Sequence, residues 1–168
     1  MTLHMITRYR ALGFLFCVCF LIARSFAEED SPEPAGSSEG TVGTANVMQF
    51  GAMIFCATGR NPLDYNGYGC YCGFGGGGKA VDAVDSCCEV HDNCYGDAIK
   101  ESGCPSWYPY VASYNAVCVA CLPSWSYGFH PLRECKHAIC KCDSAAAKCF
   151  AGNTYNKSYK DYDKKKNC

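Results

Sequence analysis

The sequence predicts a small, mainly α-helical and disulfide-rich fold. Cysteine accounts for 16 of the 168 residues, a density typical of exported domains whose core is too small to be stable without cross-links. Residues 81–102 contain no Pro and carry apolar and Cys residues at helical intervals, and residues 132–150 are rich in Ala and Lys and follow Pro131, which suits the first turn of a helix. Residues 61–78 are instead dominated by Gly, which favours a loop determined by its backbone.

The N-terminus has the features of a secretory signal peptide. Arg8 and Arg10 precede an apolar run over residues 11–23, and Ser25-Phe26-Ala27 places small residues at both positions that determine cleavage. The run has 13 residues, whereas a helix needs roughly 20 to cross a bilayer. We therefore expect a secreted protein in which residues 1–27 are the signal peptide.

Residues 28–45 form an acidic segment that is not expected to fold. They hold five acidic and no basic residues among Ser, Pro and Gly, and such a composition buries too little apolar surface to form a core. A removed propeptide and a solvated leader both fit this composition. The folded domain is expected to span residues 46–168, which contain 14 of the cysteines and allow up to seven disulfides.

The expected domain begins with a short helix. From Asn46 onward, Val47, Phe50 and Ile54 recur on one helical face, and no charged residue occurs before Arg60. The Gly-rich segment follows. Between the two long helices lies a stretch rich in Tyr, Trp and Pro, which favours a small β-hairpin and loops.

The two long segments are predicted to pair as antiparallel helices. Cys87 and Cys94 are seven residues apart, as are Cys142 and Cys149, and seven residues are nearly two helical turns. One antiparallel register can therefore join Cys87 to Cys149 and Cys94 to Cys142, although spacing alone leaves other pairings open. Zinc binding is the competing interpretation of the cysteines, but their C-x-C spacings and export both favour disulfides.

The same register brings two chemically active residues together. His91 would lie opposite position 145, so that Asp143 is two residues away along the axis, or about 3 Å at the helical rise. Its carboxylate and the imidazole can then form a dyad. Asp92 follows His91 directly and points about 100° away, so it can serve a neighbouring part of one site.

Residues 68–78, here called the glycine loop, are a candidate cation site. Glycines allow the chain to turn its carbonyl groups inward, and Cys70 and Cys72 can fasten the loop. Calcium accepts carbonyl and carboxylate oxygens, and Asp92 is the expected carboxylate. The glycines also match the G-x-G-x-x-G dinucleotide pattern, but that pattern requires a preceding buried strand, which this run does not provide.

The net charge and the distribution of charged residues bear on which partners the protein can bind. A formal net charge of −1 argues against a nucleic-acid-binding protein that depends on phosphate contacts. Five lysines are clustered over residues 157–166, and both solvation and attraction to anionic lipid explain such a tail. Asn156-Lys157-Ser158 is a glycosylation sequon.

Three motifs carry a resemblance to a known family. They are Tyr71-Cys72-Gly73-Phe74-Gly75-Gly76, Cys87-Cys88-Glu89-Val90-His91-Asp92-Asn93-Cys94-Tyr95 and Cys140-Lys141-Cys142-Asp143. Together they resemble secreted phospholipase A2, across residues 46–168 and most closely the pancreatic and elapid-venom (group I) type. The resemblance implies Ca²⁺-dependent hydrolysis of the sn-2 acyl ester of glycerophospholipids, with release of fatty acid and lysophospholipid. It also implies a monomer that works peripherally at a phospholipid membrane or micelle surface.

The resemblance implies a ligand set for calcium in this sequence. Tyr71, Gly73 and Gly75 would offer main-chain carbonyls, and Asp92 would offer its carboxylate. The backbone N–H of Gly73 would help to stabilise the oxyanion that forms during hydrolysis.

The resemblance also implies the residues that perform the proton transfer. His91 would act as general base on a water molecule, and Asp143 would orient the imidazole and stabilise its charged form. Tyr95 and Tyr114 would hydrogen-bond the Asp143 carboxylate as supporting residues. Four apolar residues would help to form the substrate channel and its rim: Val47, Met48, Phe50 and Ile54.

The cysteine pattern of the family implies seven disulfides: Cys56 with Cys118, Cys70 with Cys168, Cys72 with Cys88, Cys87 with Cys149, Cys94 with Cys142, Cys104 with Cys135, and Cys121 with Cys140. The sequence departs from the family between Cys118 and Cys135, where Cys121 comes early and residues 122–131 form a long insert. Aromatic residues of such an insert fit either a lipid interface or ordinary loop packing.

A non-catalytic receptor or channel ligand on the same scaffold is the alternative interpretation. Silent relatives in this family generally alter the calcium carboxylate or the base. Because His91 and Asp92 are both present, the enzyme is the favoured interpretation.

Overall fold

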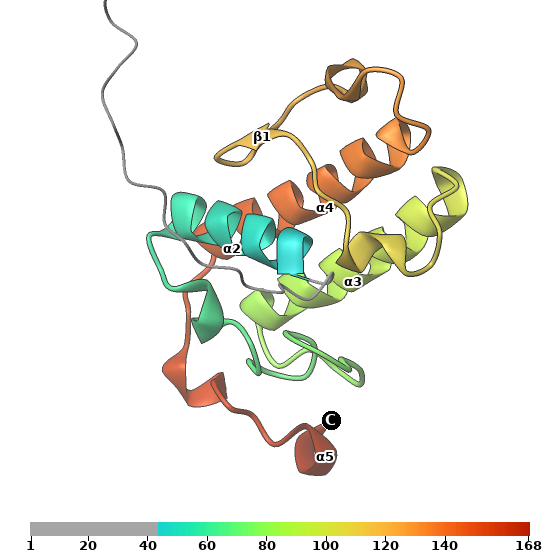
Figure 1. Cartoon of the computed structure of the whole chain (residues 1–168). Helices are drawn as coiled ribbons and strands as arrows, with labels where there is room; N and C mark the ends of the chain where they lie inside the picture. Colours follow the sequence, from blue (N-terminus) through green and yellow to red (C-terminus); the bar gives the residue numbers. More distant parts are fainter. Residues whose placement is uncertain (1–43) are drawn as a thin grey trace, which may run out of the picture. The chain divides into compact units, whose positions relative to one another are not determined.

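The computed structural model describes residues 44–168. The expected signal peptide (1–27) lies outside the described residues, as does the expected leader (28–45) except for its last two residues. The elements in chain order, with η for a 3₁₀ helix, are α2 (Thr44–Thr58), η1 (Pro62–Asp64), α3 (Ala83–Glu101), η2 (Tyr108–Tyr110), β1 (Ala116–Val117), β2 (Ala120–Cys121), η3 (Ser124–Tyr127), α4 (Arg133–Ala151), η4 (Lys157–Tyr159) and α5 (Lys164–Asn167) (Figure 1). The predicted mainly helical fold with a small hairpin is confirmed.

Helices α3 and α4 run side by side in opposite directions (Figure 1). The disulfides Cys87–Cys149 and Cys94–Cys142 join them at two levels, which the antiparallel register requires. α3 begins where the side chain of Asp82 accepts the backbone N–H of Asp85 at 2.9 Å, the usual way to satisfy a free donor at a helix start. The predicted bounds of both helices differ from the observed ones by only one or two residues.

Helix α2 starts at Thr44, two residues before the predicted start at Asn46. It packs against α4, and its residue Ile54 is buried in the main core. Val47 at the other end of the same face is 67% exposed. The apolar face predicted for this helix therefore extends from the core to the molecular surface. The core also contains Met53, Tyr65, Tyr68, Val84, Ile139, Ala147 and Phe150.

Seven disulfides join the 14 cysteines of the described residues: Cys56–Cys118, Cys70–Cys168, Cys72–Cys88, Cys87–Cys149, Cys94–Cys142, Cys104–Cys135 and Cys121–Cys140. These are the pairs that the family resemblance implies. Two of them tie the glycine loop, at Cys70 to the C-terminal residue and at Cys72 to α3. None of the helices in residues 44–168 has the length and apolar character of a membrane-spanning segment.

The insert at residues 122–131 folds back against the hairpin and α4. Its η3 residue Tyr127 accepts the backbone N–H of Asn115 at 2.9 Å, and His137 Nδ1 of α4 lies 2.9 Å from the carbonyl oxygen of Leu122. Trp125 is nevertheless 76% exposed, and Phe129 is fully exposed. The insert is therefore anchored at Leu122 and Tyr127, while two aromatic side chains remain at the surface.

Candidate active site

Helices α3 and α4 place His91 against Asp143. The distance from His91 Nε2 to Asp143 Oδ1 is 2.7 Å. The Asp143 side chain is completely buried, whereas the His91 side chain is 11% exposed. Phe50 of α2 stacks on the imidazole, with ring centroids 4.6 Å apart. The imidazole is therefore held between a carboxylate and an aromatic ring, and part of it remains accessible.

Two tyrosines from different elements complete the surroundings of Asp143. The hydroxyl of Tyr95 donates to Asp143 Oδ1 and that of Tyr114 to Oδ2, each at 2.6 Å. Burial and, next, the Asp143 charge raise the pKa of both hydroxyls well above the ordinary value, so both remain donors. The buried carboxylate is thereby satisfied by three polar partners, as a buried charge requires.

A cleft of about 1040 Å³ gives access to His91 and Asp92, which both line it. Most of its other lining residues are apolar or aromatic and come from α2, η1 and the residue after it, the glycine loop, η2 and α4: Val47, Met48, Phe50, Ile54, Phe55, Leu63, Tyr65, Phe74, Tyr110 and Phe150. The four residues expected in the substrate channel are all among them. The chemistry-bearing residues are therefore grouped within an otherwise apolar cleft, which suits a substrate with long hydrocarbon chains.

Some carbonyl groups of the glycine loop are used in hydrogen bonds, and others are free. The carbonyl of Cys70 accepts the N–H of Gly77 at 3.2 Å, and that of Cys72 accepts both Gly67 N–H and the Lys164 ammonium group, each at 3.1 Å. Seven carbonyls of the loop accept no hydrogen bond from the described residues: those of Gly69, Tyr71, Gly73, Phe74, Gly75, Gly76 and Gly77. The three carbonyls that the family resemblance assigns to calcium, those of Tyr71, Gly73 and Gly75, are among them and are therefore available.

Gly73 has a conformation and surroundings that exclude a side chain. Its φ is +98°, a region that residues other than Gly rarely occupy. A Cβ atom built on Gly73 would lie 2.6 Å from Asn66 Oδ1 and 3.1 Å from the backbone nitrogen of Gly67. The loop can therefore fold tightly at this point only because position 73 is Gly.

Asp92 supplies the one carboxylate of this candidate cation site. No ion pair within residues 44–168 involves it. Partial burial raises its pKa, while the nearby His91 and Lys164 lower it. Free carbonyls beside a carboxylate without a partner are the oxygen donors that Ca²⁺ prefers, so the residues present fit this ion. The described residues contain no cluster of three or more His, Cys, Asp or Glu side chains suited to a metal, so the backbone carbonyls are essential to such a site.

The competing interpretations of the motifs do not fit the structure. The cysteines of both C-x-C motifs are joined in disulfides, so they are not available as zinc ligands. Within the described residues, the two strands are residues 116–117 and 120–121, so no strand precedes the glycine loop. The dinucleotide pattern therefore lacks the structural context that it needs.

Three residues that contact the site were not predicted from the sequence. Asn46 donates to the hydroxyl of Tyr95 at 3.3 Å and also to the carbonyl of Pro109. Lys164 and Asp85 both bind the backbone of the glycine loop. These contacts join positions far apart in the sequence, and no periodicity or spacing in the sequence indicates them.

Comparison with known proteins gives one consistent result. Residues 47–160 match the family model described as Phospholipase A2. The chain is 44% identical to "Phospholipase A2 AP-PLA2-II" of Acanthaster planci, with 71% of this chain and 84% of that protein covered. It is 48% identical to "Phospholipase A2 A2-actitoxin-Cgg2a" of Condylactis gigantea, with 70% and 97% covered. With its helical, seven-disulfide fold, the chain therefore belongs to the phospholipase A2 family of phospholipid-hydrolysing enzymes.

Proposed function

We propose that this protein is a secreted, Ca²⁺-dependent phospholipase A2 that hydrolyses the sn-2 acyl ester of glycerophospholipids with His91 as general base. The products are a fatty acid and a lysophospholipid. The observation that carries the proposal is one apolar cleft shared by His91, Asp92 and the glycine loop, with His91 bonded to Asp143 behind it.

His91 has one ring nitrogen bound and one free. Nε2 is engaged by Asp143, and Nδ1 has no hydrogen-bond partner within the described residues. Nδ1 takes a proton from water as the water oxygen attacks the ester carbonyl carbon, and His91 then returns the proton to the departing glycerol oxygen. Asp143 fixes the tautomer and stabilises the positive imidazolium. The protein contributes no covalent nucleophile to this reaction.

The carbonyls of Tyr71, Gly73 and Gly75 and the carboxylate of Asp92 would hold the Ca²⁺ ion. When bound, the ion supplies Lewis-acid polarisation of the ester carbonyl. The backbone N–H of Gly73, which donates no hydrogen bond within the described residues, is available for the developing oxyanion.

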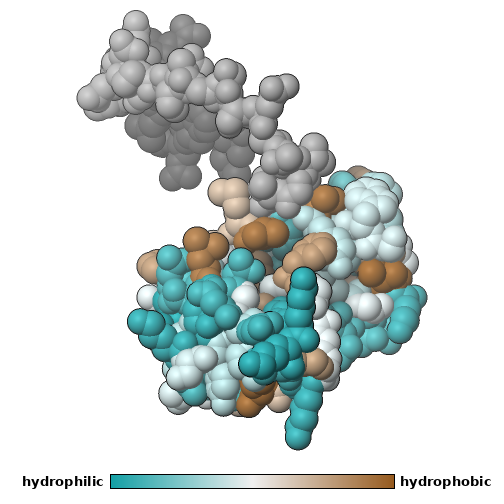
Figure 2. All heavy atoms as spheres, turned by 90° about the horizontal axis from the view of Figure 1, so that it is seen from below, coloured by the Kyte–Doolittle hydropathy of each residue, from teal (hydrophilic) through white to brown (hydrophobic). Residues whose placement is uncertain are grey.

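The cleft has an apolar rim that supports contact with a phospholipid surface. Six of its lining residues are more than half exposed: Val47, Met48, Phe55, Leu63, Phe74 and Tyr110. The space-filling view also shows apolar groups at the surface among polar ones (Figure 2). Aromatic and aliphatic side chains gain free energy when they enter a lipid interface. We therefore expect the protein to bind membranes or micelles peripherally. The family resemblance also implies a monomer, and the net charge of −1 argues against nucleic-acid binding.

Two substitutions with matched controls test the site. His91→Gln is expected to slow release of fatty acid from mixed phosphatidylcholine and phosphatidylglycerol vesicles by about 10² to 10⁴-fold, the usual contribution of a general base, while Ca²⁺ binding is kept. Asp92→Lys is expected to abolish both. His130→Gln and Asp97→Lys make the same chemical changes at exposed positions and should leave the rate unchanged.

The result with chelator distinguishes the alternatives. Excess EGTA is expected to stop hydrolysis by the unmodified protein. Undiminished hydrolysis in EGTA, or by either site variant, would overturn the proposed mechanism. If the unmodified protein binds vesicles but releases no fatty acid, it is a non-catalytic binding protein on this scaffold.

A further inference from the structure

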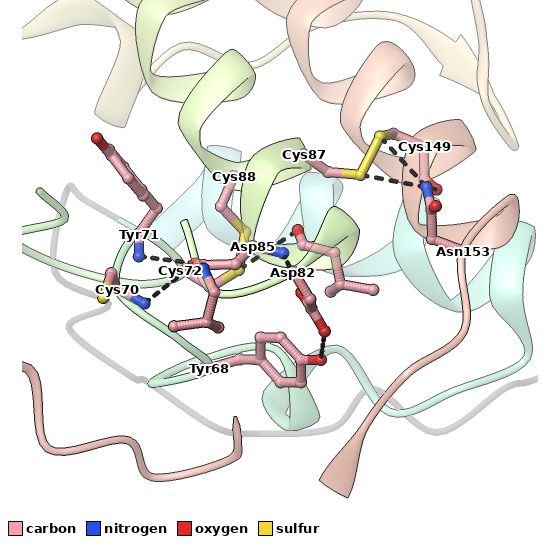
Figure 3. The surroundings of a disulfide bond; sticks show 12 residues. Tyr68, Cys70, Tyr71, Cys72, Asp82, Asp85, Cys87, Cys88, Cys149 and Asn153 are labelled. Carbon is pink, nitrogen blue, oxygen red and sulfur yellow. Dashed lines mark hydrogen bonds between the residues drawn. A yellow bond between two sulfur atoms is a disulfide. The ribbon is translucent and has the colours of Figure 1, made fainter. Parts of the chain in front are cut away.

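A completely buried aspartate lies beneath the glycine loop and outside the cleft lining. The carboxylate of Asp85 accepts three backbone N–H groups: those of Cys70 and Tyr71 at 2.7 Å each (Figure 3) and that of Val81 at 3.0 Å. Such charge-assisted bonds to a carboxylate are about twice as strong as those between neutral groups. Asp85 therefore holds the loop more firmly than a neutral acceptor at the same position would.

The sequence provides the space that this contact needs. Gly69 has a φ of +56°, and a Cβ atom built on it would lie 2.4 to 2.7 Å from the carboxylate atoms of Asp85. Any side chain at this position would therefore force the loop and the carboxylate apart. The backbone of Gly69 therefore packs directly against the Asp85 carboxylate, and this contact requires glycine at position 69.

Asp85 belongs to the first turn of α3, the helix that also carries His91 and Asp92. The start of this helix is fixed in turn by Asp82, which accepts the N–H of Asp85 and the hydroxyl of Tyr68. Asp92 follows Asp85 by seven residues, or about 10 Å along a rigid helix. The contact therefore connects the two parts of the candidate ligand set, the loop carbonyls and the helix carboxylate.

We infer that Asp85 is a positioning residue that fixes the carbonyl of Tyr71 relative to Asp92 and thereby sets the Ca²⁺ affinity of the glycine loop. The backbone N–H that Asp85 binds and the carbonyl expected to bind the ion belong to the same residue, Tyr71. Asp85 fixes the peptide plane before Tyr71, and the Cys72 N–H, bonded to the Tyr68 carbonyl at 3.2 Å, restrains the plane that contains the Tyr71 carbonyl, so the direction of this carbonyl is limited before the ion arrives. Preorganised ligands bind more tightly because less ordering is needed on binding. The inference rests on the proposed Ca²⁺ site.

The substitution Asp85→Asn tests this inference with little change in shape. The amide keeps one oxygen acceptor but loses the charge and the second acceptor, so the loop is less firmly held. Ca²⁺ titration by calorimetry is expected to show a dissociation constant raised by about 10 to 100-fold, the usual effect of removing a group that orients metal ligands. The hydrolysis rate at saturating Ca²⁺ should change much less than the affinity. Asp97→Asn removes the same charge from an exposed position of α3 and should not change the affinity.

A measurement on the unmodified protein keeps the test independent of the variant's folding. The amides of Cys70 and Tyr71 are expected to exchange with deuterium at least tenfold more slowly than that of Gly75 without Ca²⁺, because the buried carboxylate holds them. Equal exchange rates, or unchanged Ca²⁺ affinity in a folded Asp85→Asn variant, would overturn the inference while leaving the proposed function intact. Failure of the unmodified protein to bind Ca²⁺ would overturn both.

Discussion

The hydrogen bonds from Tyr95 and Tyr114 to Asp143 permit a quantitative prediction. Each Tyr→Phe substitution removes one bond of 2.6 Å to a carboxylate that is completely buried. Because no water replaces the lost donor there, we expect each change to lower the free energy of unfolding by about 1.5 to 3 kcal/mol, the value for a hydrogen bond to a charged group. In the double variant Asp143 keeps only His91, so the loss should exceed the sum of the single losses by about 0.5 to 3 kcal/mol.

The assay is denaturant unfolding with the disulfides intact, combined with initial rates on vesicles. The tyrosines contact Asp143 rather than the substrate, so the rates of the single variants should fall by less than about tenfold, well below the general-base contribution. Tyr162→Phe is the control, because its hydroxyl makes no hydrogen bond within the described residues. Single variants with unchanged stability, or with rates as low as that of His91→Gln, would refute the supporting role of the two hydroxyls.

Two further predictions follow from tyrosine burial and from loop geometry. The raised pKa values of Tyr95 and Tyr114 mean that the folded state favours the neutral hydroxyls; this stabilisation is complete below the unfolded pKa near 10 and is lost as the pH rises from there through the folded-state pKa. Tyrosinate absorbance against pH should show these two residues ionising only on unfolding, and ordinary titration of all tyrosines in the folded protein would contradict this. Gly73→Ala should destabilise the protein by about 1 to 3 kcal/mol and weaken Ca²⁺ binding, because it combines positive φ with a contact to Asn66. Gly77→Ala, which would meet no atom within 4 Å and has no positive φ, is the matched control in thermal unfolding and Ca²⁺ titration, and equal effects of the two changes would argue against the loop geometry.

Much of the helical framework was predictable because it depends on local spacing. The repeat of seven residues between cysteines matches nearly two helical turns, and two such repeats fit one antiparallel alignment of α3 with α4, which the structure confirms. That alignment also predicts that His91 and Asp143 lie close together, and they are in contact in the structure. The start of α2 was predicted two residues late because Thr44 and Ala45 continue the helix beyond the apolar pattern.

The insert and the surroundings of the site depend on contacts between distant segments. The sequence left residues 122–131 open between lipid contact and loop packing, and the structure shows anchoring by Tyr127 with Trp125 and Phe129 exposed. Asn46, whose side chain reaches Tyr95 across the fold, is a polar residue at a helix start with no spacing rule to reveal its partner. Such contacts form only when folding brings distant segments together and buries them, so the sequence alone does not reveal them.

By itself, the sequence determined the class of fold and the residue types available for disulfides and acid–base chemistry, because helical periodicity and side-chain chemistry are local properties, whereas the full set of disulfide pairs was implied only by the family resemblance. Only the tertiary structure decided which carbonyls of the glycine loop remain free and which groups hold it. The carbonyl of Cys70 accepts a hydrogen bond from Gly77, and that of Cys72 accepts hydrogen bonds from Gly67 and Lys164. The carboxylate of Asp85 accepts the backbone N–H groups of Cys70 and Tyr71. Each backbone group is chemically the same along the chain, so its availability is set by the partners that folding brings to it.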